Sequence, residues 1–196
     1  TYMNLSGTSI AKAARNRVPD PADVIVVLDE IQLPLGTVRI RLEGSHGGVY
    51  AVSWSPQNDR LASGGEDGSV RILNASSGAT LATWEGHTGR VRSVSWSPQG
   101  DRVVSAGHDG SVRLWSADSG DILVTLTGQG LVWSVAWSRR GDRVASGNGS
   151  NGILHIWDAS SGAQLVEVEE PSDWIQAVSW SPSGDRVVSG SFKGHI

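Results

Sequence analysis

The sequence repeats itself with a period in the low forties, and this periodicity restricts the folds open to the chain. Tryptophan recurs with spacings of 42, 41 and 43 residues, and glycine recurs every 42 residues in two further registers. The recurring positions are Trp54, Trp96, Trp137 and Trp180, then Gly44, Gly86 and Gly128, then Gly68, Gly110, Gly152 and Gly194. A unit of this length cannot bury its own faces, so its neighbours must stack on it.

The clearest copy of the unit, residues 86–127, has the pattern of four short strands joined by turns. Residues 91–96 alternate apolar and polar side chains, as a strand with one buried face does. Ser-Pro-Gln-Gly-Asp at 97–101 and His-Asp-Gly at 108–110 have the composition of tight turns. We therefore predict a four-stranded antiparallel meander with strands over residues 91–96, 102–105, 111–115 and 122–126. The four recurring tryptophans are interpreted as packing between neighbouring units.

These recurring positions make the chain resemble the WD40 (WD-repeat) family, from Gly44 to the last residue. The resemblance implies an all-β propeller of four-stranded antiparallel blades. It also implies that a His, a Ser or Thr, an Asp and a Trp form a buried hydrogen-bonded network within a blade. By position these four are His87, Ser105, Asp109 and Trp115.

Only the unit 86–127 holds all four network residues. The unit before it has Ser45, Ser63, Asp67 and Leu73 at these positions, and the unit after it has Gln129, Ser146, Asn151 and Trp157. The last unit keeps Ser189 and has Lys193 at the Asp position. Because a fully satisfied polar network specifies one strand register, we expect the unit 86–127 to be the most rigid.

The repeat divides the chain into an extension and five units. Residues 1–23 do not fit the repeat and are expected to be an N-terminal extension or linker. Residues 24–196 are predicted to be a propeller segment of three complete blades and two half blades. The complete blades are 44–85, 86–127 and 128–170, and the half blades are 24–43 and 171–196. The first half blade is expected to supply the third and fourth strands of a blade, and the second half blade the first and second.

Composition excludes several classes of function. The net charge of −4 and the pI near 5.7 indicate neither a nucleic-acid nor a membrane partner. The absence of cysteine excludes disulfides and thiolate metal sites and agrees with a cytoplasmic location. The five histidines fall at repeat positions, and neither a His-Glu-x-x-His motif nor a phosphate-binding loop is present. We therefore expect no cofactor, no metal and no enzyme activity.

The resemblance implies that a protein or peptide partner binds one face of the propeller. That face is formed by the ends of the first strands and by the turns before the conserved Asp. Arginine and large aromatic residues, which are enriched where partners bind, recur at these positions. The strand ends supply Tyr50, Arg90, Arg92, Leu131, Trp133, Trp174 and Gln176, and the turns supply Glu66, His108, Ser150 and Phe192. The alternative is that Trp133 and Trp174 only pack against neighbouring loops.

Three functions stay open from the sequence. The first is a non-catalytic interaction scaffold or sensor module within a larger multidomain signalling protein. The second is a homodimer that closes a ring, with residues 24–42 completing the blade begun by residues 176–191. The third is a substrate platform for an upstream enzyme domain. Propellers close with about four to eight blades, so we also expect that the chain is a piece of a longer propeller.

Overall fold

The computed structural model describes residues 25–28, 38–41, 47–127, 130–169 and 174–193. Over these residues the regular structure is β-strand, arranged in three four-stranded and two two-stranded sheets. The three complete blades expected from the repeat are present as antiparallel sheets whose strands follow one another in sequence order. The fold class predicted from the periodicity is therefore confirmed.

Each complete blade is named here by its order along the chain. Blade 1 consists of β3 (Val49–Trp54), β4 (Arg60–Gly65), β5 (Val70–Asn74) and β6 (Thr80–Trp84). Blade 2 consists of β7 (Val91–Trp96), β8 (Arg102–Gly107), β9 (Val112–Ser116) and β10 (Ile122–Leu126). Blade 3 consists of β11 (Val132–Trp137), β12 (Arg143–Asn148), β13 (Ile153–Asp158) and β14 (Gln164–Glu169). The two strands that follow are β15 (Ile175–Trp180) and β16 (Val187–Ser191).

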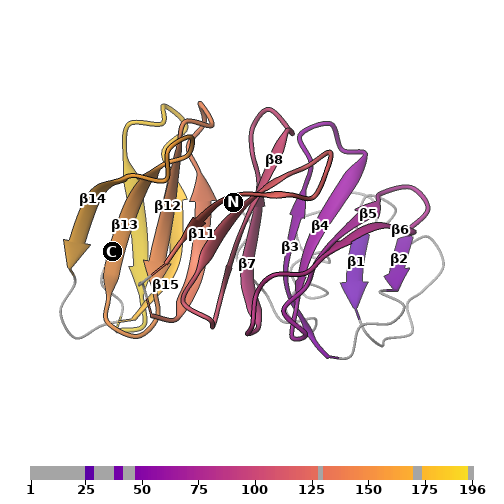
Figure 1. Ribbon diagram of the computed structural model, residues 1–196, viewed down its shortest axis with the longest axis horizontal. Coiled ribbons are helices and arrows are strands. Elements are labelled where there is room, and N and C mark those ends of the chain that lie inside the picture. The colour runs from indigo at the N-terminus through magenta and orange to yellow at the C-terminus, as the bar shows by residue number, and fades with distance from the viewer. Residues whose placement is uncertain (1–24, 29–37, 42–46, 128–129, 170–173, 194–196) are drawn as a thin grey trace.

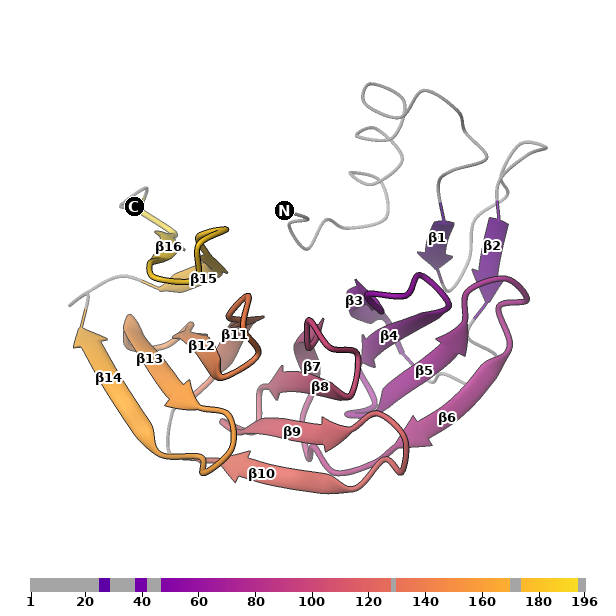
Figure 2. The same ribbon diagram turned by 90° about the horizontal axis from the view of Figure 1, so that it is seen from above.

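The blades fan out around a common centre and form an open arc (Figure 2). The first strands β3, β7, β11 and β15 lie innermost, and the fourth strands β6, β10 and β14 lie at the outer edge. The strands of neighbouring blades stand side by side (Figure 1), and the pair β15–β16 lies at the end of the arc away from blade 1 (Figure 2). The arrangement buries both faces of blade 2 between two neighbours, as the stacking argument requires.

The two strands near the N-terminus do not pair as the half blade that we expected. β1 (Ile25–Leu28) and β2 (Val38–Arg41) form a separate sheet in which they run parallel, with Ile25 opposite Val38. The third and fourth strands of a blade run antiparallel, as β5 and β6 do. An uninterrupted apolar run such as Ile-Val-Val-Leu is typical of strands in parallel sheets. The repeat spacing alone predicted an antiparallel pair here, because spacing carries no information on strand direction. The expected extension, residues 1–23, lies outside the described residues.

The first two strands of every blade are joined by the same turn. In blade 2 the Ser97 hydroxyl donates to the Asp101 carboxylate at 2.7 Å and accepts from the Arg102 amide at 3.0 Å. The same Ser–Asp bond recurs as Ser55–Asp59, Ser138–Asp142 and Ser181–Asp185. The turn requires a positive φ, which Gly100 supplies in blade 2 and Asn58 in blade 1, since asparagine tolerates this region.

Neighbouring blades pack through apolar side chains on the inner strand of the later blade. From blade 2 these side chains are Val91, Val94 and Trp96, packed on Ala51, Ala62 and Ile72 of blade 1. From blade 3 they are Val132, Val135 and Trp137, packed on Val104, Ala106 and Leu114 of blade 2. β15 contributes Ile175 and Val178, packed on Ala145 and Leu154 of blade 3. The apolar core therefore lies between the blades.

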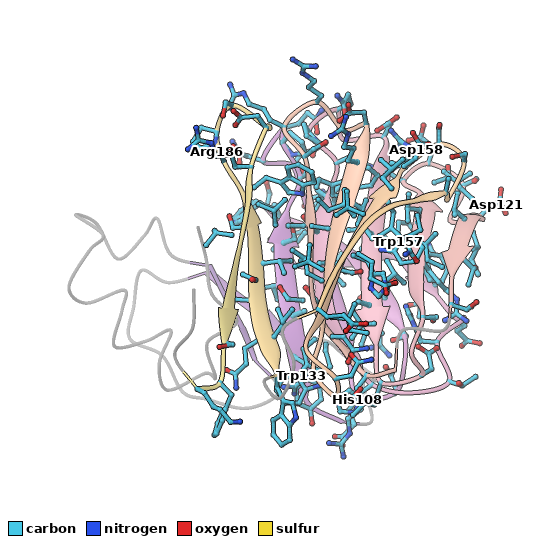
Figure 3. The ribbon with its side chains drawn as sticks, turned by 90° about the vertical axis from the view of Figure 1, so that its left-hand side faces the viewer. His108, Asp121, Trp133, Trp157, Asp158 and Arg186 are labelled. Carbon is cyan, nitrogen blue, oxygen red and sulfur yellow. The ribbon has the colours of Figure 1, made fainter. Side chains whose placement is uncertain are left out.

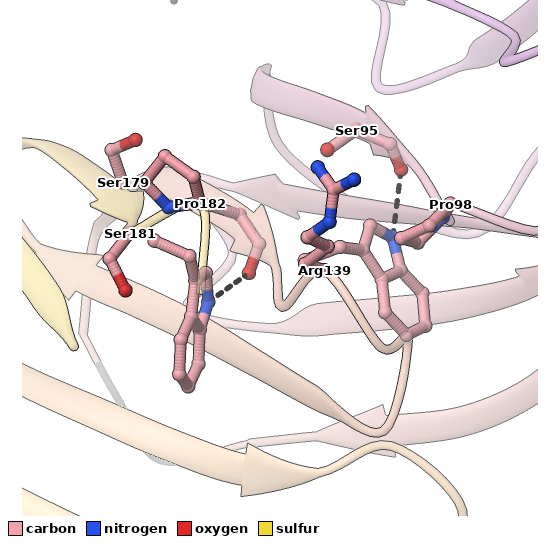
Figure 4. A pocket seen from close by; sticks show the side chains of 9 residues that line it. Ser95, Pro98, Arg139, Ser179, Ser181 and Pro182 are labelled. Carbon is pink, nitrogen blue, oxygen red and sulfur yellow. Dashed lines mark hydrogen bonds between the residues drawn. The ribbon is translucent and has the colours of Figure 1, made fainter. Parts of the chain in front are cut away.

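Two of the tryptophans that end the inner strands, Trp137 and Trp180, also donate a hydrogen bond to the sheet before them, whereas Trp96 Nε1 has no such partner among the described residues. Trp137 Nε1 donates to the Ser95 carbonyl at 3.1 Å, and Trp180 Nε1 donates to the Ala136 carbonyl at 3.1 Å (Figure 4). The guanidinium of Arg102 lies over the Trp137 ring, 4.9 Å from its centre. Each such contact joins two blades, so the tryptophan period sets the spacing of the arc.

Trp54 departs from the packing that we expected for all four recurring tryptophans. Its side chain is 41% exposed, whereas Trp96 and Trp137 are buried. The reason is its position on β3, the first strand of blade 1, whose outward face has no complete blade against it (Figure 2). A residue type at a repeat position is buried only when the neighbouring unit is there to cover it.

Candidate functional site: the turn face of the blades

Blade 2 brings together the four residues of the expected network. Trp115 Nε1 donates to the Ser105 hydroxyl at 2.7 Å, and the Ser105 hydroxyl lies 2.7 Å from His87 Nε2. His87 Nδ1 lies 3.0 Å from the Asp109 carboxylate. With the proton of a neutral His87 on Nδ1, each group donates to the next, from the indole to the carboxylate. Arg113 completes the arrangement by donating to Asp109 at 3.0 Å.

The protonation states within this network follow from burial and hydrogen bonding. Burial lowers the pKa of His87 below its usual value, against the attraction of the Asp109 carboxylate. Burial by itself would raise the pKa of Asp109, but hydrogen bonds from His87 and Ser111 outweigh it and hold that pKa well below its usual range. At pH 7 His87 is therefore neutral and Asp109 is ionised, which is the arrangement that the bond directions require.

The other blades keep only parts of the network. In blade 3 Trp157 Nε1 donates to the Ser146 hydroxyl at 2.9 Å. The turn there is held by Asn148, whose side-chain oxygen accepts from the Ser150 amide at 2.7 Å, and not by Asn151 as we expected. The extra residue in this turn shifts the anchoring side chain toward β12. Ser45 and Gln129, expected at the His position, lie outside the described residues.

One backbone hydrogen bond recurs in each blade and brings the two sets of predicted site residues together. It runs from an amide in the turn after the second strand to a carbonyl at the start of the first strand. The bonds are Glu66 to Gly48 at 2.9 Å, His108 to Arg90 at 2.9 Å, Gly149 to Leu131 at 2.7 Å and Phe192 to Trp174 at 3.0 Å. The residues that make these bonds lie on one face, which we call the turn face. Trp133 and His108 lie at this end of the blades, and Asp158 and Arg186 lie at the other end (Figure 3).

Five side chains on the turn face form a continuous row across the arc, which we call the arginine–aromatic row: Tyr50, Arg92, Trp133, Trp174 and Phe192. The Arg92 guanidinium lies 5.0 Å from the centre of the Tyr50 ring and 5.6 Å from that of Trp133. Trp133 meets Trp174 edge-on at 5.7 Å, and Trp174 meets Phe192 at 5.8 Å. Every blade contributes to this row, and Trp174 and Phe192 are 48% and 67% exposed.

Three further predicted residues flank one end of the row. Arg90 lies 5.7 Å from the centre of the Tyr50 ring and forms an ion pair with Glu66 at 2.6 Å. His108 follows in the next turn, and burial and then the charges of Arg92 and Arg90 lower its pKa. The positive charge near His108 comes from these two arginines. Cation–π contacts and this charge make the end near blades 1 and 2 suited to an anionic group.

Some buried polar atoms on the turn face have no hydrogen-bond partner among the described residues. They include His108 Nε2 and Trp133 Nε1. Buried polar groups in proteins are almost always paired, so an unpaired one marks a place where a ligand or water can bind.

The remaining predicted residues are not part of the row. Leu131, just before β11, and Gln176, on β15, are exposed. Ser150 is used by its own turn, where its hydroxyl donates to Asn148 at 2.8 Å. Position in the repeat placed these residues at strand ends and turns that lie together, and partner binding by this face stays a prediction. Position alone did not distinguish side chains that point along the row from those that hold the turn.

The described part of the chain holds no group of three or more His, Cys, Asp or Glu side chains that could bind a metal ion. In the same described ranges, no helix is long and apolar enough to cross a membrane.

Comparison with known proteins identifies a feature at the N-terminus that the sequence reading missed. A family model for peptidyl-tRNA hydrolase matches residues 1–53. A peptidyl-tRNA hydrolase of Sulfurihydrogenibium sp. (strain YO3AOP1) is 48% identical over 48 residues, which cover 24% of this chain and 25% of the relative. The enzyme of Symbiobacterium thermophilum is 52% identical over 52 residues, covering 26% and 28%. The chain thus spans about a quarter of the length of these curated relatives.

Two signals could have revealed this segment. The first is the failure of residues 1–23 to fit the repeat, which we attributed to a linker. The second is the apolar run over residues 25–28, which is typical of a parallel sheet and now forms the parallel strand β1. The matched segment ends within β3, so it also overlaps the start of the repeats.

A second family model, described as WD domain, G-beta repeat, accounts for the rest of the chain. It matches four times, over residues 36–74, 78–116, 120–158 and 162–196. The first three matches end with the third strands β5, β9 and β13, in step with the tryptophan period, and the fourth runs to residue 196. Since these matches cover well over half of the sequence and fall on its antiparallel blades, the chain belongs to the WD40 family of β-propeller repeat proteins, which serve as protein-interaction scaffolds.

Proposed function

We propose that the turn face binds an acidic peptide segment of a protein partner, and that this module acts as a non-catalytic scaffold or sensor within a larger signalling protein in the cytoplasm. The single observation that carries the proposal is the arginine–aromatic row. Aromatic and arginine side chains supply most of the binding energy at protein interfaces. The row offers them from four successive sheets on one face.

The charge distribution favours an acidic partner. Arg90 and Arg92 flank Tyr50 and lie near His108, and Glu66 pairs with Arg90. A carboxylate of the ligand would add a charge-assisted hydrogen bond to a guanidinium that is already oriented by two rings. The exposed rings of Trp174 and Phe192 would cover apolar side chains of the same peptide.

We predict that Arg92→Ala and Trp174→Ala each weaken binding of an acidic, aromatic-containing peptide by about tenfold, which corresponds to about 1.4 kcal/mol. Synthetic peptides of varied charge, titrated with the protein and followed by calorimetry, would measure this. Trp174 is the better target than Trp133, because a Cβ added at Gly149 would come within 2.4 Å of the Trp133 ring, so that this ring also supports the turn.

Two matched variants control this experiment. Arg140→Ala removes an exposed arginine from a turn at the opposite end of the blade, and Leu165→Ala removes an apolar side chain from β14, where it is 48% exposed. Neither should alter peptide affinity. If Arg92→Ala and Trp174→Ala left affinity unchanged as well, the row would be a packing feature only.

A second candidate function follows from the match over residues 1–53. The arc would then act as a platform beside a segment related to peptidyl-tRNA hydrolase. Because the chain spans only about a quarter of those enzymes, we expect the segment by itself to be inactive. Incubation of the protein with a peptidyl-tRNA should release no more tRNA than buffer does. Release above that background would favour the platform function over the scaffold.

A further inference from the structure

The two ends of the arc carry the two halves of a blade-to-blade contact. One half is the leading face, which we define as Val49, Val52 and Trp54 on β3. The other half is the trailing face, which we define as Ala177, Val188 and Gly190 on β15 and β16. Both faces can be compared with the three contacts that the structure already contains between neighbouring sheets.

In the other sheets, the residues equivalent to the leading face pack against the preceding blade. Val91, Val132 and Ile175, the counterparts of Val49, are all 0% exposed. The counterparts of Val52 and Trp54 are equally covered, with Val94 at 7% and Trp96 at 5%. Val52 and Trp54 themselves are 42% and 41% exposed with β1 and β2 in place. The apolar side chains of a blade contact are thus present on β3 without the surface that they fit.

The trailing face is the matching surface. In blade 1 a Cβ added at Gly64 would lie 2.5 Å from Val91 of the next blade, and in blade 3 one added at Gly147 would lie 2.4 Å from Ile175. These glycines therefore form sockets for the first apolar residue of the following strand. Gly190 occupies the same position on β16, and nothing described lies within 4 Å of its Cβ position. Val188, beside it, is 49% exposed, while its counterparts Ala62, Val104 and Ala145 are 0% exposed.

The polar contacts of the two faces are complementary as well. Arg60 and Arg102 each cover the tryptophan of the next blade at 4.9 Å from the ring centre. Their counterpart Arg186 has a side chain that is 86% exposed. Ser95 and Ala136 offer their carbonyls to the next indole, and their counterpart on β15 is Ser179. An exposed arginine at one end thus matches an exposed tryptophan at the other.

We propose that a second copy of this chain docks its leading face on the trailing face of the first. Val49 of the second copy enters the socket at Gly190, and its Val52 packs on Val188. Its Trp54 lies under Arg186 and donates to the Ser179 carbonyl. Contiguous exposed apolar surface of this kind marks an interaction site. The strand that fits the trailing face is β3 of the same polypeptide, whose Val52 and Trp54 are exposed.

The contact is head-to-tail, so two copies can form it twice and close a ring. Docking also brings Phe192 of one copy toward Tyr50 of the other, which extends the arginine–aromatic row around the ring.

Sedimentation over a range of concentrations tests this. We expect the intact chain to associate from a single copy of 20.7 kDa to twice that mass. Gly190→Leu fills the socket, and Trp54→Ala removes the indole; each should weaken association at least tenfold. Leu165→Ala, on the outer strand β14, is the control and should associate as the unchanged chain does.

The folding of each variant must be followed at the same time. Gly190→Leu should unfold at the same denaturant concentration as the unchanged chain when both are dilute, because its side chain meets open space. Gly147→Leu, at the equivalent but occupied socket, should be strongly destabilised. A chain that stays a single copy at all concentrations would overturn the proposal and assign the trailing face to another polypeptide. Association that neither Gly190→Leu nor Trp54→Ala weakens would overturn it too.

Discussion

Trp137→Ala is expected to destabilise the protein by about 4 kcal/mol, the cost typical of removing a large buried aromatic side chain. The Trp137 ring is 7% exposed and packs between blades 2 and 3. The substitution also removes the indole donor to Ser95 at 3.1 Å and the ring beneath Arg102. Urea unfolding followed by circular dichroism would measure the loss, with the denaturant midpoint as the readout.

Trp54→Ala is the matched comparison for this prediction. The two residues occupy the same position in their blades, but Trp54 is 41% exposed. In dilute solution, where single copies prevail, its loss should cost about 1 kcal/mol from the smaller apolar area uncovered. Equal destabilisation by both substitutions would show that burial between blades is not what makes the recurring tryptophan important.

Asp109→Ala is expected to destabilise the protein by about 3 to 5 kcal/mol, the range for breaking a buried charged pair. The change leaves His87 Nδ1 and the Arg113 guanidinium without their carboxylate. It also removes the acceptor of the Thr88 amide at 3.1 Å and of the Ser111 hydroxyl at 2.8 Å. The same urea titration at pH 7 would measure the loss.

Asp67→Ala in blade 1 should cost at least about 1 kcal/mol less, because Asp67 is more exposed and serves only part of such a network. Its side chain is 25% exposed, against 7% for Asp109, and its partners are Ser69 and Arg71. Identical midpoints for the two variants would contradict the view that the four-residue network makes blade 2 the most rigid.

Acid should reduce the contribution of Asp109 in a defined pH range. Hydrogen bonds hold its folded-state pKa below the ordinary value of 3.8, so its contribution is complete above about pH 3.8 and is lost as the pH falls through the folded-state pKa. The difference in unfolding free energy between the unchanged chain and Asp109→Ala should therefore be larger at pH 5 than at pH 3. This sign follows from the unfolded state binding the proton more tightly.

Most of the blade architecture could be predicted from the sequence, because its causes are local. Alternating apolar residues, Ser-x-x-x-Asp turns and glycines with positive φ recur at fixed offsets, and each acts within a few residues of itself. The resemblance to the WD40 family implied the network of blade 2 and the members of the turn face, and the same locality allowed these residues to be assigned by position. A residue at a given repeat position lies at a given end of a given strand whatever surrounds it.

The sequence by itself therefore determined the strands, the turns and the side of each blade on which a residue lies. Only the tertiary structure decided what each of those residues touches. β1 pairs parallel with β2 although its spacing fits an antiparallel blade, and Trp54 is exposed although Trp137 is buried. The stacking of Arg92 between Tyr50 and Trp133 likewise depends on three different sheets. Strand direction, burial and ring contacts depend on a neighbour distant in the chain, and a local pattern carries no information on whether that neighbour is there.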